Sequence, residues 1–86
     1  MKKLDQLEKL RKEIDKIDSE LIRVIAKRFK VTGKVKLLKI KNDLPREDKN
    51  REAQIMDVAC KLAGKLNISG ELVKNILRLI IKESKK

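Results

Sequence analysis

The 86-residue chain contains no histidine, tyrosine or tryptophan, and it has one phenylalanine, one cysteine and one proline. Without histidine and tyrosine, and without a GxSxG or CxxC motif, the usual acid–base and covalent catalytic classes are poorly supported. The single cysteine, Cys60, excludes a disulfide within the chain and cannot build a zinc site when no histidine is present. We therefore expect an aliphatic core, no metal and no cofactor.

The sequence also lacks a long apolar run. Its first residues lead directly into charged sequence, and nowhere do the roughly 18 apolar residues of a membrane span follow one another. We therefore expect a single cytoplasmic domain over residues 1–86, with no membrane partner. The 24 Lys and Arg against 13 Asp and Glu leave a formal net charge of +11, which attracts nucleic acid, anionic membrane or a small anionic metabolite.

Apolar residues recur at alternating three- and four-residue spacings through the first half of the chain, the pattern of one helix face. The positions of this seam are Leu7, Leu10, Ile14, Ile17, Leu21, Val24, Val31, Val35 and Leu38. The pattern predicts one long helix from near Leu4 or Asp5 to Asn42, before Pro45. Two shorter helices are expected after the N-cap residues Asp48 and Ser69. The stripe of the first reads Glu52, Ile55, Ala59, Leu62 and Leu66, and that of the second Val73, Ile76, Leu77, Ile80 and Ser84. The fold class is therefore all-α, with three helices per chain.

The length of the first helix bears on assembly. About 37 residues of helix extend about 55 Å, whereas a compact domain of this size has a radius of gyration of about 12 Å. Because the two shorter helices cannot cover the whole apolar seam, the remainder should pack against a second copy. We therefore predict an intertwined helical homodimer.

Charged residues occupy places where helices should be apolar. Arg28 interrupts the seam, and Lys39, eleven residues later, shares its face about 16 Å further along the helix axis. An isolated seam arginine usually packs its stem and extends its head to solvent. A helix cap explains Asp48 and Glu52, but it leaves Arg51 at the unfavourable end of the helix dipole. Ser84, taken singly, is a solvated serine at a helix end.

Taken together in their order and spacing, these positions resemble the all-helical chorismate mutase family over nearly the whole chain. The residues that match are Arg11, Arg28, Lys39, Asp48, Arg51, Glu52 and Ser84. The resemblance implies the Claisen rearrangement of chorismate to prephenate in aromatic amino-acid biosynthesis, by electrostatic and conformational restraint. It also implies a homodimer with two active sites, each completed by Arg11 of the other chain. Helix geometry agrees, because Arg11 and Lys39 are 28 residues apart, or about 42 Å along one helix, too far to touch one small ligand.

The resemblance also implies a role for each residue. Arg28 and the partner's Arg11 bind the two carboxylates of chorismate, and Lys39 also donates to the ether oxygen. Glu52 and the backbone of Asp48 hold the substrate hydroxyl. Arg51 and Ser84 are supporting members that bind or orient these groups. Arg11, Arg28, Lys39 and Glu52 are thus the predicted catalytic residues.

One feature departs from the family, and three alternatives stay open. The family commonly places a glutamine one helical turn after Ser84, and the sequence holds none there, which implies a slower enzyme or a shortened terminus. Isochorismate–pyruvate lyases share the fold and a similar cationic pocket. A basic helical dimer could instead bind nucleic acid through Lys34, Lys36, Lys39 and Lys41, although no nucleic-acid partner is our expectation. A structural coiled coil fits less well, because of the proline and the two further amphipathic helices.

Overall fold

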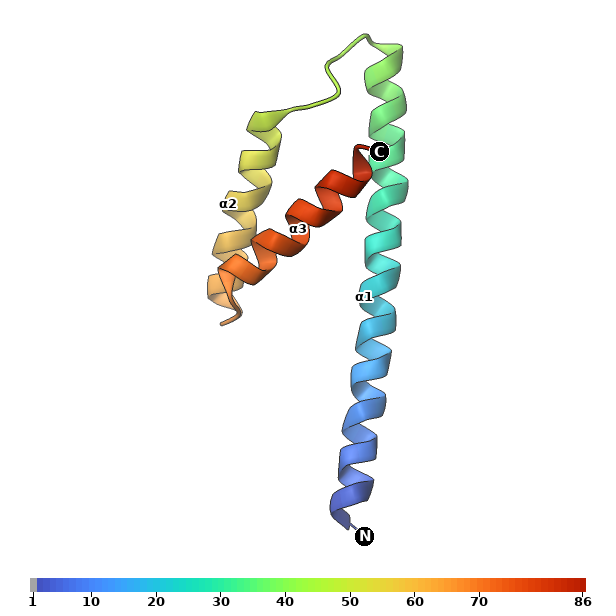
Figure 1. Cartoon of the computed structure of the whole chain (residues 1–86), viewed down its shortest axis with the longest axis vertical. Coiled ribbons are helices and arrows are strands. Elements are labelled where there is room, and N and C mark those ends of the chain that lie inside the picture. Colours follow the sequence, from blue (N-terminus) through green and yellow to red (C-terminus); the bar gives the residue numbers. More distant parts are fainter. Residues whose placement is uncertain (1) are drawn as a thin grey trace. The chain divides into compact units, whose positions relative to one another are not determined.

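The computed structural model describes residues 2–86 of the chain and contains three α-helices (Figure 1). They are α1 (Lys2–Lys41), α2 (Lys49–Lys65) and α3 (Gly70–Ser84). No strand occurs within residues 2–86. The predicted all-α class, with one long and two shorter helices, is therefore confirmed.

The helix boundaries follow from local capping chemistry. Asp48 is the N-cap of α2, where its side chain accepts a hydrogen bond from the backbone N–H of Arg51. Ser69 is the N-cap of α3 and accepts from the N–H of Leu72. Beyond the end of α1, Asp43 adopts a left-handed conformation with φ of 55°, which turns the chain out of the helix. The predicted caps at Asp48 and Ser69 are thus both confirmed.

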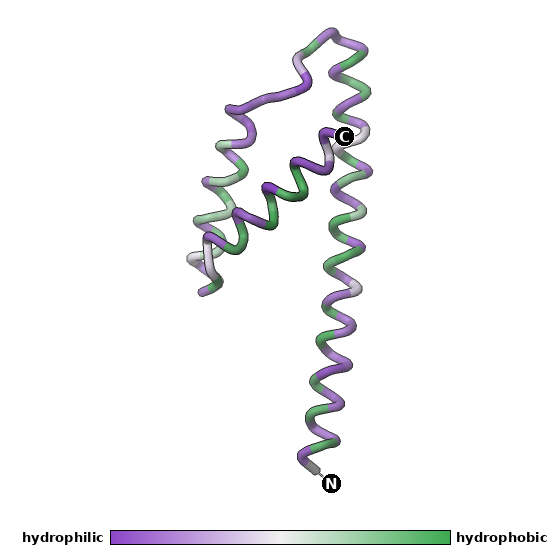
Figure 2. Tube along the Cα trace, in the orientation of Figure 1, coloured by the Kyte–Doolittle hydropathy of each residue, from purple (hydrophilic) through white to green (hydrophobic). Residues whose placement is uncertain are grey.

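The chain divides into two compact units, residues 1–31 and residues 32–86. The first unit consists of most of α1, along which hydrophilic and hydrophobic residues alternate from turn to turn (Figure 2). All of the seam residues predicted from the sequence are exposed in the single chain, with Leu21 at 55% and Val24 at 62%. A continuous apolar face of this kind is unusual on a soluble monomer. Apolar side chains that stay in contact with water contribute no hydrophobic free energy to folding.

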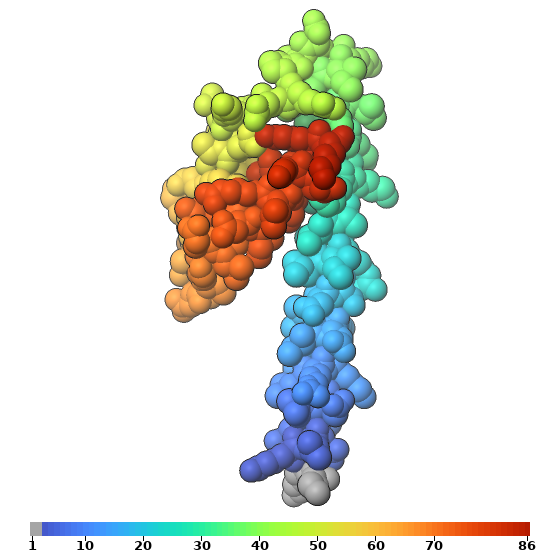
Figure 3. Space-filling model, viewed as in Figure 1, coloured from blue at the N-terminus to red at the C-terminus, as the bar shows by residue number. Residues whose placement is uncertain are grey.

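The second unit is built around the packing of α2 against α3, which runs back alongside α2 after a short turn (Figure 1). Three side chains are buried in the described part of the molecule: Ala59, Ala63 and Ile81. The two alanines lie on one face of α2 and let α3 approach closely, so that the side chains of the two helices lie against one another (Figure 3).

This packing differs from the predicted stripes on both helices, because on α3 the buried residue is Ile81, which was not predicted, and the predicted Ile76 is 43% exposed. Leu62 and Leu66 were predicted on the inner face of α2, but they are 53% and 60% exposed. The helix buries Ala63 instead, because α3 covers the alanine side. The larger leucines are left on a face that the single chain does not cover.

None of the helices in residues 2–86 has the uninterrupted apolar stretch needed to cross a bilayer.

Candidate functional site

Hydrogen bonds between distant parts of the second unit join the end of α1, the segment before α2 and the end of α3. We call this group the helix-end cluster: Lys36, Lys39, Arg46, Glu47, Glu52, Lys85 and Lys86. In it, Lys36 Nζ donates to the carbonyl oxygen of Lys86 at 3.1 Å. Lys85 Nζ lies 3.0 Å from Glu47 Oε1 and 2.8 Å from Glu52 Oε1. The cluster thus gathers ammonium groups and carboxylates from four segments: the end of α1, the segment before α2, the start of α2 and the end of α3.

Lys39 is half-buried, and its ammonium donates to the carbonyl oxygen of Arg46 at 3.2 Å. A carbonyl is a neutral acceptor, so this hydrogen bond leaves the charge of Lys39 without a counter-ion. The contact also fixes the direction of the side chain, because Arg46 lies in the segment that leads into α2. Lys39 is therefore held in place while remaining available to an anionic group.

The first turn of α2 carries three of the predicted site residues. Asp48 Oδ1 accepts from the Arg51 N–H at 3.0 Å, and the Asp48 carbonyl accepts from the Glu52 N–H at 3.1 Å. The Asp48 side chain is therefore used in capping the helix, as expected of an N-cap aspartate. The Arg51 side chain is exposed, whereas Glu52 is half-buried. Of the three, Glu52 is the side chain that reaches another helix, through Lys85.

Ser84 ends α3 and is half-buried. Its hydroxyl donates to the carbonyl oxygen of Ile81 at 2.7 Å, a bond within the same helix turn. Because the hydroxyl proton of Ser84 is used in this bond, the hydroxyl oxygen can take part in a further hydrogen bond only as an acceptor. Ser84 thus lies at the end of α3, next to Lys85.

Sequence reasoning missed Lys85, which contacts two carboxylates. The hydrogen bonds that the Lys85 ammonium donates to Glu52 and then to Glu47 raise the pKa of Lys85 above its ordinary value of 10.5. The hydrogen bond and the positive charge of Lys85 in turn hold the pKa of Glu47 below its ordinary value of 4.5. No sequence pattern distinguishes this residue, because it lies in a lysine-rich segment in which any lysine could equally be a solvated surface residue.

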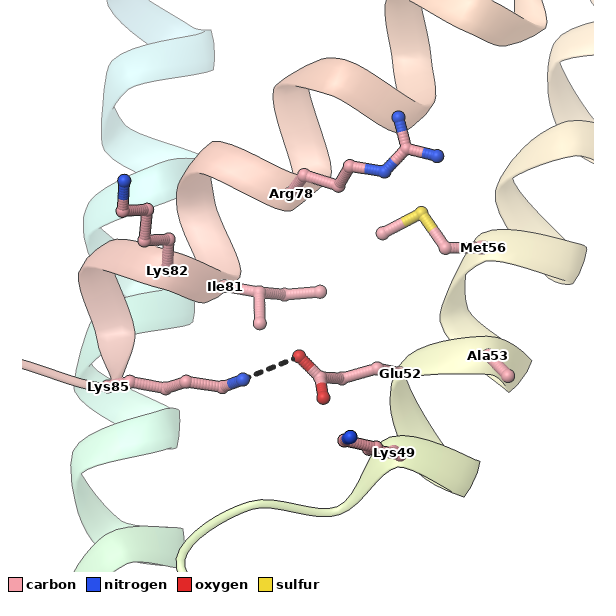
Figure 4. Close-up of a pocket in the computed structure, with 8 residues that line it drawn as sticks. All are labelled: Lys49, Glu52, Ala53, Met56, Arg78, Ile81, Lys82 and Lys85. Carbon is pink, nitrogen blue, oxygen red and sulfur yellow. Dashed lines mark hydrogen bonds and ion pairs between the residues drawn. The ribbon is translucent and has the colours of Figure 1, made fainter.

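An open groove of about 370 Å³ lies between α2 and α3 (Figure 4). Its lining residues are Lys49, Glu52, Ala53, Met56, Arg78, Ile81, Lys82 and Lys85. The side chains of Glu52 and Lys85 meet across one part of the groove, with Ile81 beside them (Figure 4). Glu52 is the one predicted site residue in this lining, so the groove is not the whole of the predicted site.

The remaining two predicted residues, Arg11 and Arg28, belong to the first unit. Arg28 is half-buried, and its Nη1 atom is buried without a hydrogen-bond partner among the described residues. A buried guanidinium nitrogen without an acceptor is costly, so this atom has an unused donor to which a ligand oxygen could bind. Arg11 is exposed, and its contact with Glu8 at 3.4 Å is a surface ion pair that contributes little to stability.

Comparison with known proteins gives a consistent result. Residues 10–86 match the family model described as chorismate mutase type II. The chain is 35% identical over 81 residues to the T-protein of Haemophilus influenzae, covering 94% of this chain and 22% of that protein. It is 36% identical over 59 residues to the bifunctional chorismate mutase/prephenate dehydratase of Aquifex aeolicus, covering 69% of this chain and 16% of that protein.

A shorter relative is covered almost completely. The chain is 29% identical over 82 residues to the chorismate mutase of Methanocaldococcus jannaschii. These residues make up 95% of this chain and 83% of the relative. By contrast, the chain spans about a fifth of the length of the T-protein. Because the family model matches 77 of the 86 residues, from residue 10 to residue 86, the family is shown on nearly the whole sequence. The chain belongs to the chorismate mutase type II family.

Proposed function

We propose that this chain catalyses the rearrangement of chorismate to prephenate. The observation that carries the proposal is Arg28 Nη1, a buried donor on an otherwise apolar seam that has no acceptor among the described residues. Chorismate carries two carboxylates, and a carboxylate is the group that best satisfies a guanidinium. The relative from Methanocaldococcus jannaschii, a protein of similar length, is named chorismate mutase.

The residues of the helix-end cluster supply the other contacts in this proposal. Lys39, whose present acceptor is a neutral carbonyl, donates to a substrate carboxylate and to the ether oxygen. Glu52, half-buried at the start of α2, accepts a hydrogen bond from the substrate hydroxyl, beside the backbone of Asp48. Arg51 and Ser84 support these contacts from the ends of α2 and α3. Each role agrees with the resemblance seen in the sequence.

The chemistry requires no nucleophile and no obligatory proton transfer, because one ether bond breaks while one carbon–carbon bond forms within the same molecule. An acceleration of about 10⁶ corresponds to about 8 kcal/mol. Restraint of the reactive conformer and fixed donors toward the developing negative charge on the ether oxygen are together of this size. A chain without histidine or tyrosine can therefore perform the reaction.

We propose that the active form is a homodimer, in which Arg11 of one chain completes the site of the other. The exposed seam of α1 supports this, since apolar residues such as Leu21 and Val24 require a covering surface. A second copy has the matching seam, and a twofold interface brings the same surface of each chain together. Arg11, whose partner in the chain is an exposed glutamate, is free to turn toward a substrate carboxylate.

The proposed function is tested by incubating the purified chain with chorismate and following its loss by absorbance, with prephenate identified as the product. The proposal predicts saturable turnover without added metal or cofactor. A parallel incubation with isochorismate examines the lyase alternative. Release of pyruvate from isochorismate, with no prephenate formed from chorismate, would overturn the proposal.

A further inference from the structure

Lys85 is the one ammonium group in the helix-end cluster that binds two carboxylates. Its Nζ lies 2.8 Å from Glu52 Oε1, on α2, and 3.0 Å from Glu47 Oε1, in the segment before α2. The Lys85 side chain is 36% exposed and that of Glu52 28%, so the pair is partly shielded from water. These contacts span 33 and 38 residues of sequence and therefore belong to the tertiary structure.

The contact with Glu52 uses one oxygen of the carboxylate. Oε1 accepts from Lys85, while Oε2 has no hydrogen-bond partner among the described residues. Figure 4 shows the Glu52 carboxylate directed toward Lys85 across the groove between α2 and α3. A glutamate held at one oxygen keeps the other free to accept a hydrogen bond in a fixed direction. This is the requirement for binding a single substrate hydroxyl.

The ion pair between Lys85 and Glu47 also restrains the backbone on either side of Glu47. Glu47 follows Arg46, whose carbonyl oxygen receives the Lys39 ammonium at 3.2 Å. It precedes Asp48, the N-cap of α2. Holding Glu47 therefore holds the acceptor that orients Lys39 and the cap from which α2 begins.

No other described cation forms an ion pair with Glu47 or Glu52. Lys49 also lines the groove and lowers the pKa of Glu47 by its charge, but it forms no ion pair with Glu52. Lys82 and Arg78 line the groove as well, and neither forms an ion pair with Glu52 or Glu47 in the described structure. Without Lys85, the two carboxylates would repel each other, and Glu52 would lose its restraint.

We propose that Lys85 is a positioning residue, which fixes Glu52 for the substrate hydroxyl and, through Glu47, fixes the segment that orients Lys39. The inference rests on the proposed function, because it is the substrate that gives Glu52 its task. Lys85 itself touches neither the breaking nor the forming bond. Its effect on turnover passes through Glu52 and the segment of residues 46–48.

Steady-state kinetics with chorismate test the proposal in Lys85→Met, which keeps the apolar stem and removes the charge. We expect kcat/KM to fall by about tenfold to a hundredfold, the scale of a small misplacement of a binding group. Lys85→Arg, which can still bridge two carboxylates, restores most of the activity. Lys65→Met is the matched control, because Lys65 is an exposed lysine at the end of α2, outside the groove and with no ion pair among the described residues, and its kcat/KM stays within about twofold.

A double substitution separates positioning from general stability. In a Glu52→Gln background, adding Lys85→Met lowers kcat/KM by less than about threefold, because the residue through which most of the effect passes is already altered. An equal loss in both backgrounds would overturn the proposal, and so would unchanged kcat/KM in Lys85→Met beside an active wild type. A wild-type chain that forms no prephenate would overturn the proposed function itself, and this inference with it.

Discussion

Lys39 donates a hydrogen bond from its ammonium to the carbonyl oxygen of Arg46 at 3.2 Å. A lysine is thereby held by a neutral oxygen seven residues along the chain, although carboxylates of the same cluster are bound to Lys85 instead. Lys39 and Lys85 thus have acceptors of different charge. Lys85 pairs with the two carboxylates of the cluster, whereas the charge of Lys39 has no counter-ion among the described residues.

The seam of α1 predicts the assembly of the chain. Leu21→Glu should convert the homodimer to a monomer, because two unpaired carboxylates would enter an apolar interface. Burial of such charges costs about 3 kcal/mol or more, which weakens association at least a hundredfold. Sedimentation equilibrium at micromolar concentration measures the change, from twice the chain mass of 10.0 kDa to that mass.

The matched control for this variant is Ser19→Glu. It makes the same change in charge two residues away, at an exposed position about 160° around α1 from Leu21. We expect it to remain dimeric. A wild-type chain that sediments as a monomer, or a Leu21→Glu chain that sediments as a dimer, would contradict the proposed interface.

The proposed sharing of Arg11 predicts complementation between inactive variants. Arg11→Ala and Arg28→Ala should each be nearly inactive alone. When the two are unfolded and refolded together, about half of the dimers are mixed and each mixed dimer has one intact site, so about a quarter of wild-type activity returns. Activity of the mixture equal to the sum of the separate variants would show that each site is built from one chain.

The ion pair between Glu47 and Lys85 predicts how stability changes with pH. The pKa of Glu47 is lowered in the folded chain, so its contribution is present above 4.5 and is lost as pH falls through the lowered value. The pKa of Lys85 is raised, so its contribution is present below 10.5 and is lost as pH rises through the raised value.

Urea unfolding of Glu47→Gln beside the wild type checks this window. At neutral pH the variant should unfold at lower urea concentration. The difference should vanish in acid, once Glu47 is protonated, and in strong alkali, once Lys85 is neutral. A difference that stays constant from acid to alkali would mean that the ion pair is not its cause.

Two neighbouring residues of α2 should respond to added bulk in opposite ways. Ala63 is 1% exposed between α2 and α3, so Ala63→Leu should lower the free energy of unfolding by about 1–3 kcal/mol through overpacking. At Gly64 an added Cβ meets nothing within 4 Å, so Gly64→Ala should raise that free energy by about 0.5 kcal/mol through helix propensity. Thermal or urea unfolding measures both, and a stabilised Ala63→Leu would contradict the packing of α3 on this face.

Much of the fold was predictable from the sequence because its signals are local. The spacing of the seam residues predicted the start of α1 to within three residues and its end to within one residue. Asp48 and Ser69 were identifiable as N-caps, because a cap depends on a side chain and an N–H three residues later. The charge at Arg28 was also visible, since it interrupts an otherwise apolar pattern.

The contacts of the site were less predictable because they depend on tertiary structure. The pairing of Lys85 with Glu47 and Glu52 joins segments more than 30 residues apart, and lysine at a helix end carries no periodic signal. The buried face of α2 was misplaced toward Leu62 for a related reason. Periodicity locates apolar residues, but it does not tell which of them a neighbouring helix will cover, and small alanines permit the closest approach.

The kinetics of Arg28→Ala test the central claim most directly, with Arg23→Ala as the matched control, because Arg23 is an exposed arginine on the same helix. If the half-buried Arg28, through its buried Nη1, binds a carboxylate of chorismate, kcat/KM for prephenate formation should fall by about 10²- to 10³-fold in Arg28→Ala. It should change by less than about twofold in Arg23→Ala. Equal activity of the two variants would contradict the claim that the Arg28 guanidinium of α1 restrains the substrate.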